Sequence, residues 1–281
     1  MTLRKKIVTG TAAGLLLIAA ALVYEVAIPN IVAKNYNQQL RTNAHQLQTT
    51  LETTNTLTSI TKVFTKDAVV DATGSKKELT TLKASLEKSK ASTVDFKKSA
   101  NGLRHLPLSG YFGAYRQAKT TKSNAVTVAD KVTDKVSTYK TLIDFLVSVN
   151  QIAIDSQPKM VDFSKLDNPT INQTISALRK NAQGQRETQI AYQKLTPPAD
   201  IRNDSLQITA LTGGLADGLE AYAAALERGD QTAADNAFNS NNEMSKKSAD
   251  LNEKMRQTIT SKDSPMKAVE SLPKLVSDLK L

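Results

Sequence analysis

The spacing of apolar residues between Ala118 and Leu146 constrains the fold of this 281-residue chain more than any other feature. After one gap of seven, these positions step by alternating threes and fours, as the series Ala118, Ala125, Ala129, Val132, Val136, Tyr139, Ile143 and Leu146 shows. Such spacing is typical of a helix that packs through one narrow stripe, as in a coiled coil. It continues to about Ile154, and a helix of about 40 residues predicts an elongated bundle rather than a compact globule.

Similar spacing recurs along most of the chain, and no segment alternates as a strand would. An aromatic content of 5% with no Trp also suits helices that pack through narrow seams. We therefore predict an all-α fold, in which an N-terminal transmembrane helix is followed by an elongated antiparallel helical bundle of about six long helices. The expected helices cover residues 30–70, 76–100, 118–154, 169–195, 200–228 and 231–259.

Residues typical of turns and helix ends predict where the chain is divided into helices and regions. A turn at 72–75, a connection at 155–168 and the pair Gly229-Asp230 separate the expected helices, and Ser75 with Glu78 and Asn168 with Pro169 are typical of helix starts. We expect a basic N-terminus at 1–6, a transmembrane helix at 7–28, a first hairpin region at 30–155, a second three-helix region at 168–260 and an amphipathic tail at 261–281.

The N-terminus carries the signal for a membrane anchor. Arg4, Lys5 and Lys6 precede an apolar run from Ile7 to Ile28 whose only charge is Glu25. The run is long enough to cross a bilayer as a helix, and the basic flank predicts a cytoplasmic N-terminus with the remainder exported. A cleaved signal peptide is the alternative, although the run is longer than a usual signal core and Glu25 disrupts the cleavage pattern.

Gly10 and Gly14 form a small-xxx-small pair within this run, which would let two such helices approach and form a homo-oligomer. The alternative is that glycine is simply common in membrane spans.

The amino-acid composition limits the cellular compartment and the kinds of partner that we expect for this chain. The chain has no cysteine, which excludes disulfides, a thiol nucleophile and a zinc–thiolate site, and an exported domain without disulfides fits a bacterial envelope. Its net charge of +10 would attract anionic neighbours such as lipid headgroups or phosphate-rich wall polymers. The alternative is an ordinary solvated surface of mixed charge.

The loop from Leu103 to Gly113 is the most distinctive in the chain. Its candidate interaction residues are Arg104, His105, Tyr111 and Phe112, together with Tyr115 just beyond it. If the first helix rises from the membrane and the second descends, the loop lies on the membrane-proximal side. It would then plug the end of the bundle, contact a partner protein or reach toward lipid.

No catalytic or metal-binding pattern is present in the sequence. The two histidines, His45 and His105, have no ligand partners at metal-binding spacing, and no phosphate-binding glycine loop or nucleophile elbow occurs. We therefore expect no enzyme activity, no cofactor and no metal. Nucleic-acid binding is disfavoured because aromatic residues do not interleave with the basic ones.

One segment resembles a known architecture. Leu195-Thr196-Pro197-Pro198-Ala199, a following helix that ends in Ala223–Leu226 and Glu227, and then Arg228-Gly229-Asp230 is similar to a pattern in poorly characterised, exported helical-bundle proteins of bacterial envelopes. The resemblance implies an antiparallel bundle outside the membrane and no catalytic residues. A looser resemblance exists to the periplasmic four-helix sensor modules of chemoreceptors, which have a second span that this chain lacks.

The sequence thus favours a membrane-anchored, extracytoplasmic helical bundle that acts as a non-catalytic binding or spacer module in the cell envelope. The alternative is a ligand-sensing bundle that signals through a partner membrane protein, which predicts a small-molecule pocket between helices. An enzyme would require ionisable residues to cluster in a cleft.

Overall fold

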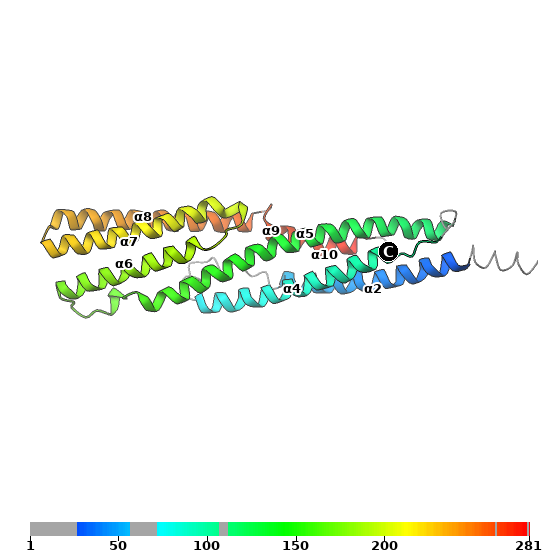
Figure 1. Cartoon of the computed structure of the whole chain (residues 1–281), viewed down its shortest axis with the longest axis horizontal. Coiled ribbons are helices and arrows are strands. Elements are labelled where there is room, and N and C mark those ends of the chain that lie inside the picture. The colour runs from blue at the N-terminus through cyan, green and yellow to red at the C-terminus, as the bar shows by residue number, and fades with distance from the viewer. Residues whose placement is uncertain (1–26, 57–71, 107–111, 262, 280) are drawn as a thin grey trace, which may run out of the picture. The chain divides into compact units, whose positions relative to one another are not determined.

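The computed structural model describes residues 27–56, 72–106, 112–261, 263–279 and 281. All secondary structure in these ranges is helical, which confirms the predicted all-α class (Figure 1). The described residues also contain the six long helices expected, namely α2 (Ile28–Thr56), α4 (Ala72–Asn101), α5 (Gly113–Ser156), α6 (Ile171–Gln193), α7 (Arg202–Arg228) and α8 (Gln231–Thr260). Five short helices complete the set: η4 (Gln157–Lys159), η5 (Phe163–Lys165), η6 (Ala199–Ile201), α9 (Pro265–Glu270) and α10 (Leu272–Ser277).

The chain divides into two compact units. Unit 1 takes in Met1–Thr53, Glu87–Val136 and Glu270–Leu281, and unit 2 takes in Thr54–Leu86 and Ser137–Val269. The division therefore passes through α2, α4 and α5, whereas the regions expected from sequence, 30–155 and 168–260, meet at the connection after α5. Because the two units share continuous helices, the composition of the loops does not show where one unit ends and the other begins.

Unit 1 is built on the stripes that the sequence predicts. The fully buried side chains of its helices include Leu40, Leu47 and Phe96, together with the expected α5 positions Ala118, Ala125, Ala129, Val132 and Val136. Helices α2 and α4 are antiparallel, because Tyr36 Oη donates to the carbonyl of Ala100 (3.0 Å) while Thr50 Oγ1 lies 3.2 Å from Ser92 Oγ. Small hydroxyl side chains along α4, such as Ser89 and Thr93, are buried and allow close approach.

In unit 2 the second part of α5 keeps its predicted stripe, since Tyr139, Ile143 and Leu146 are all buried. Helix α7 packs against both α6 and α8, as Figure 1 shows. The apolar centre of this packing consists of Ile175, Leu178, Leu219, Tyr222, Ala223 and Leu226.

The three glycines inside α7 admit side chains from the neighbouring helices, which confirms the expected close contact. A Cβ on Gly213 would stand 2.6 Å from Gln189 Cδ of α6, and one on Gly214 would stand 2.7 Å from Met244 Sδ of α8. The polar Gln189 interrupts the expected seam of α6 because it fills the space that Gly213 leaves.

Two helix starts differ from the prediction. The expected turn at 72–75 is wrong, since α4 already begins at Ala72 and Ser75 is buried within it. The first turn of α4 contacts α5, where Lys76 Nζ donates to Gln151 Oε1, and a serine fits this buried position better than a larger residue. The sequence pattern of a helix cap does not reveal this contact between α4 and α5.

The expected cap of α6 at Asn168 and Pro169 is also wrong. Helix α6 begins at Ile171, and Thr170 is its N-cap, with the side chain of Gln173 returning to the Thr170 amide. This capping box satisfies the backbone amides of Thr170 and Gln173. Asn168 instead takes a left-handed conformation with φ 43° in the preceding turn.

Most of the remaining inward positions agree, with two exceptions. Met255, Met266, Val269, Leu272 and Val276 are buried, and Gly229 (φ 68°) and Asp230 cap α7 and α8 as expected. Phe238 is 51% exposed, because Ala234 and Asn241 occupy the buried side of α8 there. Ile171 is 58% exposed, since it lies in the first turn of α6 ahead of the buried stripe.

The predicted transmembrane helix at 7–28 lies outside the described residues except for its last two positions. Gly10, Gly14 and the last part of the first expected helix, 57–70, lie outside them as well. Within the described ranges, no helix combines the length and the apolar character needed to cross a bilayer.

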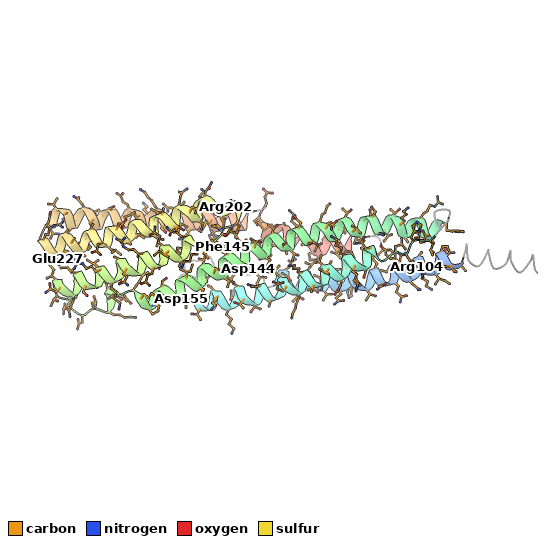
Figure 2. The ribbon with its side chains drawn as sticks, in the orientation of Figure 1. Arg104, Asp144, Phe145, Asp155, Arg202 and Glu227 are labelled. Carbon is orange, nitrogen blue, oxygen red and sulfur yellow. The ribbon has the colours of Figure 1, made fainter. Side chains whose placement is uncertain are left out.

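Asp144, midway along α5, joins α4 to α5 within unit 2 (Figure 2). Lys83 Nζ of α4 lies 2.7 Å from its Oδ1, and Lys140 Nζ donates to its Oδ2 at 2.6 Å. Partial burial alone would raise the pKa of Asp144, but the hydrogen bonds and charges of the two lysines outweigh it and lower the pKa below its usual value.

We expect Asp144→Asn to lower the stability of unit 2 near neutral pH but not in strong acid. A depressed carboxyl pKa stabilises the fold above the unfolded pKa of about 3.9, and the contribution is lost as pH falls through the folded pKa. The side chain is 36% exposed, so solvent screening limits the loss to about 1 kcal/mol. Melting curves of both proteins from pH 7 to pH 3 should converge at the acid end, and a constant gap would contradict this role.

Candidate functional site

The start of α2, the end of α4 and the start of α5 meet at one end of unit 1. The Tyr36 hydroxyl reaches the carbonyl of Ala100, so the loop that follows α4 lies beside the first turns of α2. Asn30 and Ala114 line the same groove, so the first turns of α2 and α5 are also adjacent.

Two tyrosine hydroxyls stabilise this end of unit 1 by donating hydrogen bonds to backbone oxygens. Burial raises the pKa of Tyr36 to about 12, so its hydroxyl stays a hydrogen-bond donor throughout the physiological range. The Tyr115 hydroxyl donates to the backbone oxygen of Arg104 at 2.5 Å, which ties the loop to α5. The exposed side chains of Arg104 and His105 therefore extend from backbone that is held at Arg104.

The residues expected to form an interaction loop lie in different environments. Arg104 and His105 are exposed, Phe112 is half-buried and Tyr115 is buried, while Tyr111 lies outside the described residues. Tyr115 therefore serves as a packing contact, and the accessible side chains are those of Arg104 and His105. Figure 2 shows Arg104 at the loop end of unit 1.

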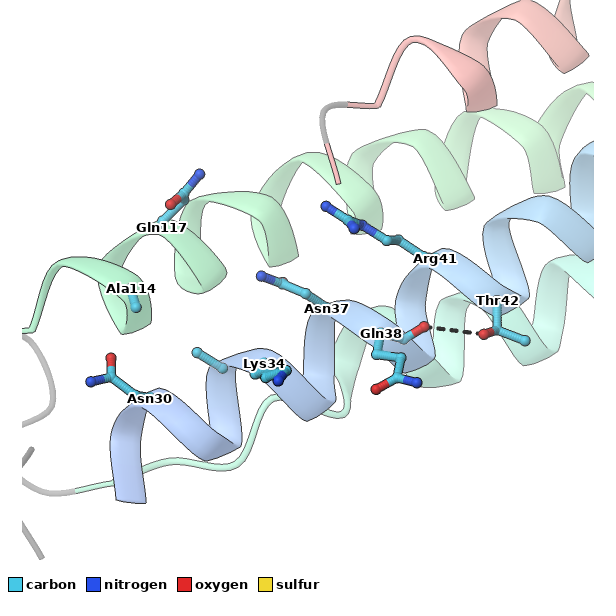
Figure 3. A pocket seen from close by; sticks show the side chains of 9 residues that line it. Asn30, Lys34, Asn37, Gln38, Arg41, Thr42, Ala114 and Gln117 are labelled. Atoms are coloured by element: carbon cyan, nitrogen blue, oxygen red, sulfur yellow. Dashed lines mark hydrogen bonds between the residues drawn. The ribbon is translucent and has the colours of Figure 1, made fainter. Parts of the chain in front are cut away.

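A groove of about 570 Å³ runs between α2 and α5 at this end (Figure 3). Its lining is polar or cationic apart from two alanines, and it consists of Asn30, Ala33, Lys34, Asn37, Gln38, Arg41, Thr42, Ala114 and Gln117. In Figure 3, Asn37 and Arg41 extend from α2 across the groove toward α5. Arg41 also donates to the backbone oxygen of Leu281. None of the lining side chains is acidic.

Basic residues lie at this end of unit 1 on α2, on the loop after α4 and on the first three turns of α5, and we call this set the basic collar: Lys34, Arg104, Arg116, Lys119 and Lys122. The chain has no Asp or Glu in residues 27–51 or 96–129, which are the segments that build the collar. Lys97 is excluded from the set, because its ammonium group pairs with Asp130 at 2.6 Å. The arrangement is suited to binding a phosphate or another anion.

The loop was recognisable from the sequence, whereas the collar was not. Helix α2, the loop and helix α5 each contribute only one to three collar cations, and uncharged residues separate these cations in the sequence. Two long stretches of the sequence without an acidic residue could nevertheless have indicated a basic surface. The pairing of the helices brings these stretches together at one end of unit 1.

A second groove, in unit 2, is apolar at its base and lies on α7 and α8. It measures about 560 Å³ and is lined by Gln207, Ala210, Leu211, Gly214, Met244, Lys247, Asp250, Leu251 and Lys254. Beside it the carboxylate of Asp204, in a residue only 5% exposed, pairs with Lys254 Nζ at 2.7 Å. This groove has the character of a shallow site for an organic ligand.

Gln185 and Gln189 of α6 pack against neighbouring side chains. Gln189 fills the space beside Gly213, and Gln185 Nε2 lies 3.8 Å from Met160 Sδ. Among the residues that the structure describes, no group of three or more histidines and carboxylates is placed to hold a metal ion.

Comparison with known proteins assigns no function to this chain, so a functional proposal must start from the geometry of the two grooves and the collar. The chain matches no family model, no curated protein and no solved structure. The resemblance to exported bundle proteins of bacterial envelopes therefore remains a prediction.

Proposed function

We propose that this chain is a membrane-anchored, extracytoplasmic helical bundle that acts as a non-catalytic binding or spacer module of the cell envelope. Its partners would be the bilayer, through residues 7–28, and a protein or an anionic polymer of the envelope. Its N-terminus would lie in the cytoplasm.

The observation that carries this proposal is the position of α2. The helix begins at Ile28, the last residue of the predicted span, and its buried stripe starts within two turns, at Ala33 and Tyr36. If residues 7–28 span the bilayer, the bundle would follow this anchor directly, and the membrane helix would hold unit 1 close to the bilayer. Helix α5, with 44 residues, extends about 66 Å and supplies the length that a spacer needs.

The absence of cysteine makes the topology directly testable. We expect a cysteine at the exposed position Asn239 to react with a membrane-impermeant maleimide in intact cells, because α8 would lie outside the membrane. A cysteine at Thr2 should react only after lysis. Mass spectrometry of the same protein should recover the N-terminal peptide, since the proposed anchor is not cleaved.

The two single-cysteine variants serve as controls for each other, because they differ only in the labelled position. Labelling in the reverse order would show that the bundle is cytoplasmic. A mature protein without its first thirty residues would show a cleaved signal peptide and would remove the anchor from the proposal.

The ligand-sensing alternative rests on the groove on α7 and α8. Its apolar base of Leu211, Met244 and Leu251 lies beside charged groups, which is the usual composition of a small-molecule site. This function predicts a rise in melting temperature with a specific metabolite, and the rise should disappear when Leu211→Trp fills the groove. A spacer predicts no such ligand.

A further inference from the structure

We propose that the basic collar binds the phosphate groups of anionic lipids in the membrane that holds the anchor. This inference rests on the proposed function, because it assumes that residues 7–28 span the bilayer. It adds a specific partner, an anionic phospholipid headgroup, and assigns it to the loop end of unit 1.

The charge of this end is the first argument. Of the five collar residues, Lys34, Arg104, Arg116 and Lys119 are exposed and Lys122 is half-buried, and none of their side chains has an acidic partner in the structure. Elsewhere in the described residues, cations often pair with carboxylates, as Lys83 does with Asp144 and Arg186 with Asp217. Exposed cations without such partners leave a positive field that favours an anionic surface.

The distance from the membrane is the second argument. Lys34 lies six residues beyond Ile28, which is about 9 Å along a helix. The headgroup layer extends roughly 5–8 Å beyond the hydrocarbon core, and electrostatic attraction acts over a Debye length of about 8 Å. The side chains of Lys34, Arg104 and Arg116 therefore fall within range of lipid phosphates.

The groove between α2 and α5 provides the third argument. Its volume of about 570 Å³ accommodates a headgroup, and its amide side chains, Asn30, Asn37 and Gln117, supply neutral donors beside the cations. A headgroup that enters the groove would meet Lys34, whereas Arg41 already donates to the terminal oxygen of Leu281. The site therefore favours an anionic headgroup over a zwitterionic one.

The test uses the full chain reconstituted into vesicles of equal parts phosphatidylglycerol and phosphatidylcholine. After extraction in mild detergent, mass spectrometry of the purified protein measures the ratio of the two co-purified lipids. Each Lys or Arg near an anionic surface contributes about a fivefold preference, so we expect phosphatidylglycerol to be enriched at least fivefold. Replacing all five collar residues by Gln should return the ratio close to one.

A matched control replaces five exposed cations of unit 2 by Gln, namely Lys180, Lys194, Arg202, Arg228 and Lys246. This control removes the same number and kind of charges, and it should keep the enrichment. A second variant, with Lys34, Lys119 and Lys122 changed to Arg, should also keep it, which separates lost charge from disturbed folding. Equal loss in the control and collar variants, or no enrichment in the unaltered protein, overturns the proposal.

Two further outcomes are decisive. If soluble poly(glycerol phosphate), at the same phosphate concentration, binds the collar more tightly than the vesicles do, the partner is a wall polymer and the lipid proposal is overturned. If the chain does not enter the vesicles, the proposed anchor fails as well. If it enters them but shows no preference among lipids, only the collar inference fails.

Discussion

Phe96→Ala is expected to lower the free energy of unfolding of unit 1 by about 3–5 kcal/mol. Phe96 lies on α4 with no exposed surface, so its truncation removes a large buried ring and leaves a cavity that the long helices cannot close. The loss is a large share of the stability of a typical domain. Hydrogen exchange of α4 peptides measures it locally, because unit 2 need not unfold together with unit 1.

The control lies two residues away on the same helix. Val94 is 60% exposed, so Val94→Ala should change the unfolding free energy by less than about 0.5 kcal/mol. If the two variants were equally stable, Phe96 would not belong to the core of unit 1, and the antiparallel packing of α2, α4 and α5 would need revision.

Gly218→Leu should destabilise unit 2 by about 1–3 kcal/mol through overpacking. A Cβ at Gly218 would stand 2.8 Å from Cγ of Asn241, and Asn241 is only 9% exposed. The amide cannot swing into solvent without moving α8, whereas the flexible Gln189 and Met244 beside the other two glycines can give way. The gain from removing a helical glycine, about 1 kcal/mol, offsets part of this cost.

Ala221→Leu is the matched control, since it adds the same side chain to an exposed position of α7 and should be nearly neutral. Adding Asn241→Ala to Gly218→Leu should recover part of the loss, because it removes the atoms that clash. Chemical denaturation followed by circular dichroism measures all four proteins. Full stability in Gly218→Leu alone would show that α7 and α8 do not approach closely at this glycine.

How far the candidate site follows from the sequence depends on the residue. Arg104 and His105 were recognisable because they sit between two clear helix ends, and both are exposed in the structure. Tyr115 looked like part of the same surface, yet it is buried and holds the loop backbone. A sequence pattern does not show whether an aromatic ring at a helix start faces solvent or a neighbouring helix.

The spacing of apolar residues was sufficient to predict that the described chain is helical and which residues face inward along most of each helix. A spacing of three and four residues places apolar side chains on one face of any α-helix, whatever surrounds it. Caps such as Gly229 and Asp230 were readable for the same reason, since they satisfy the backbone within a few residues.

Only the tertiary structure decided what depends on residues far apart in the chain. It placed Lys34, Arg104 and Arg116 at one end of unit 1, paired Gly218 with Asn241, and left Phe238 exposed. It also divided α2, α4 and α5 between two units, where no local signal marks a boundary. Pairing between distant helices is set by which side chains fit together, and that fit exists only once the helices are in contact.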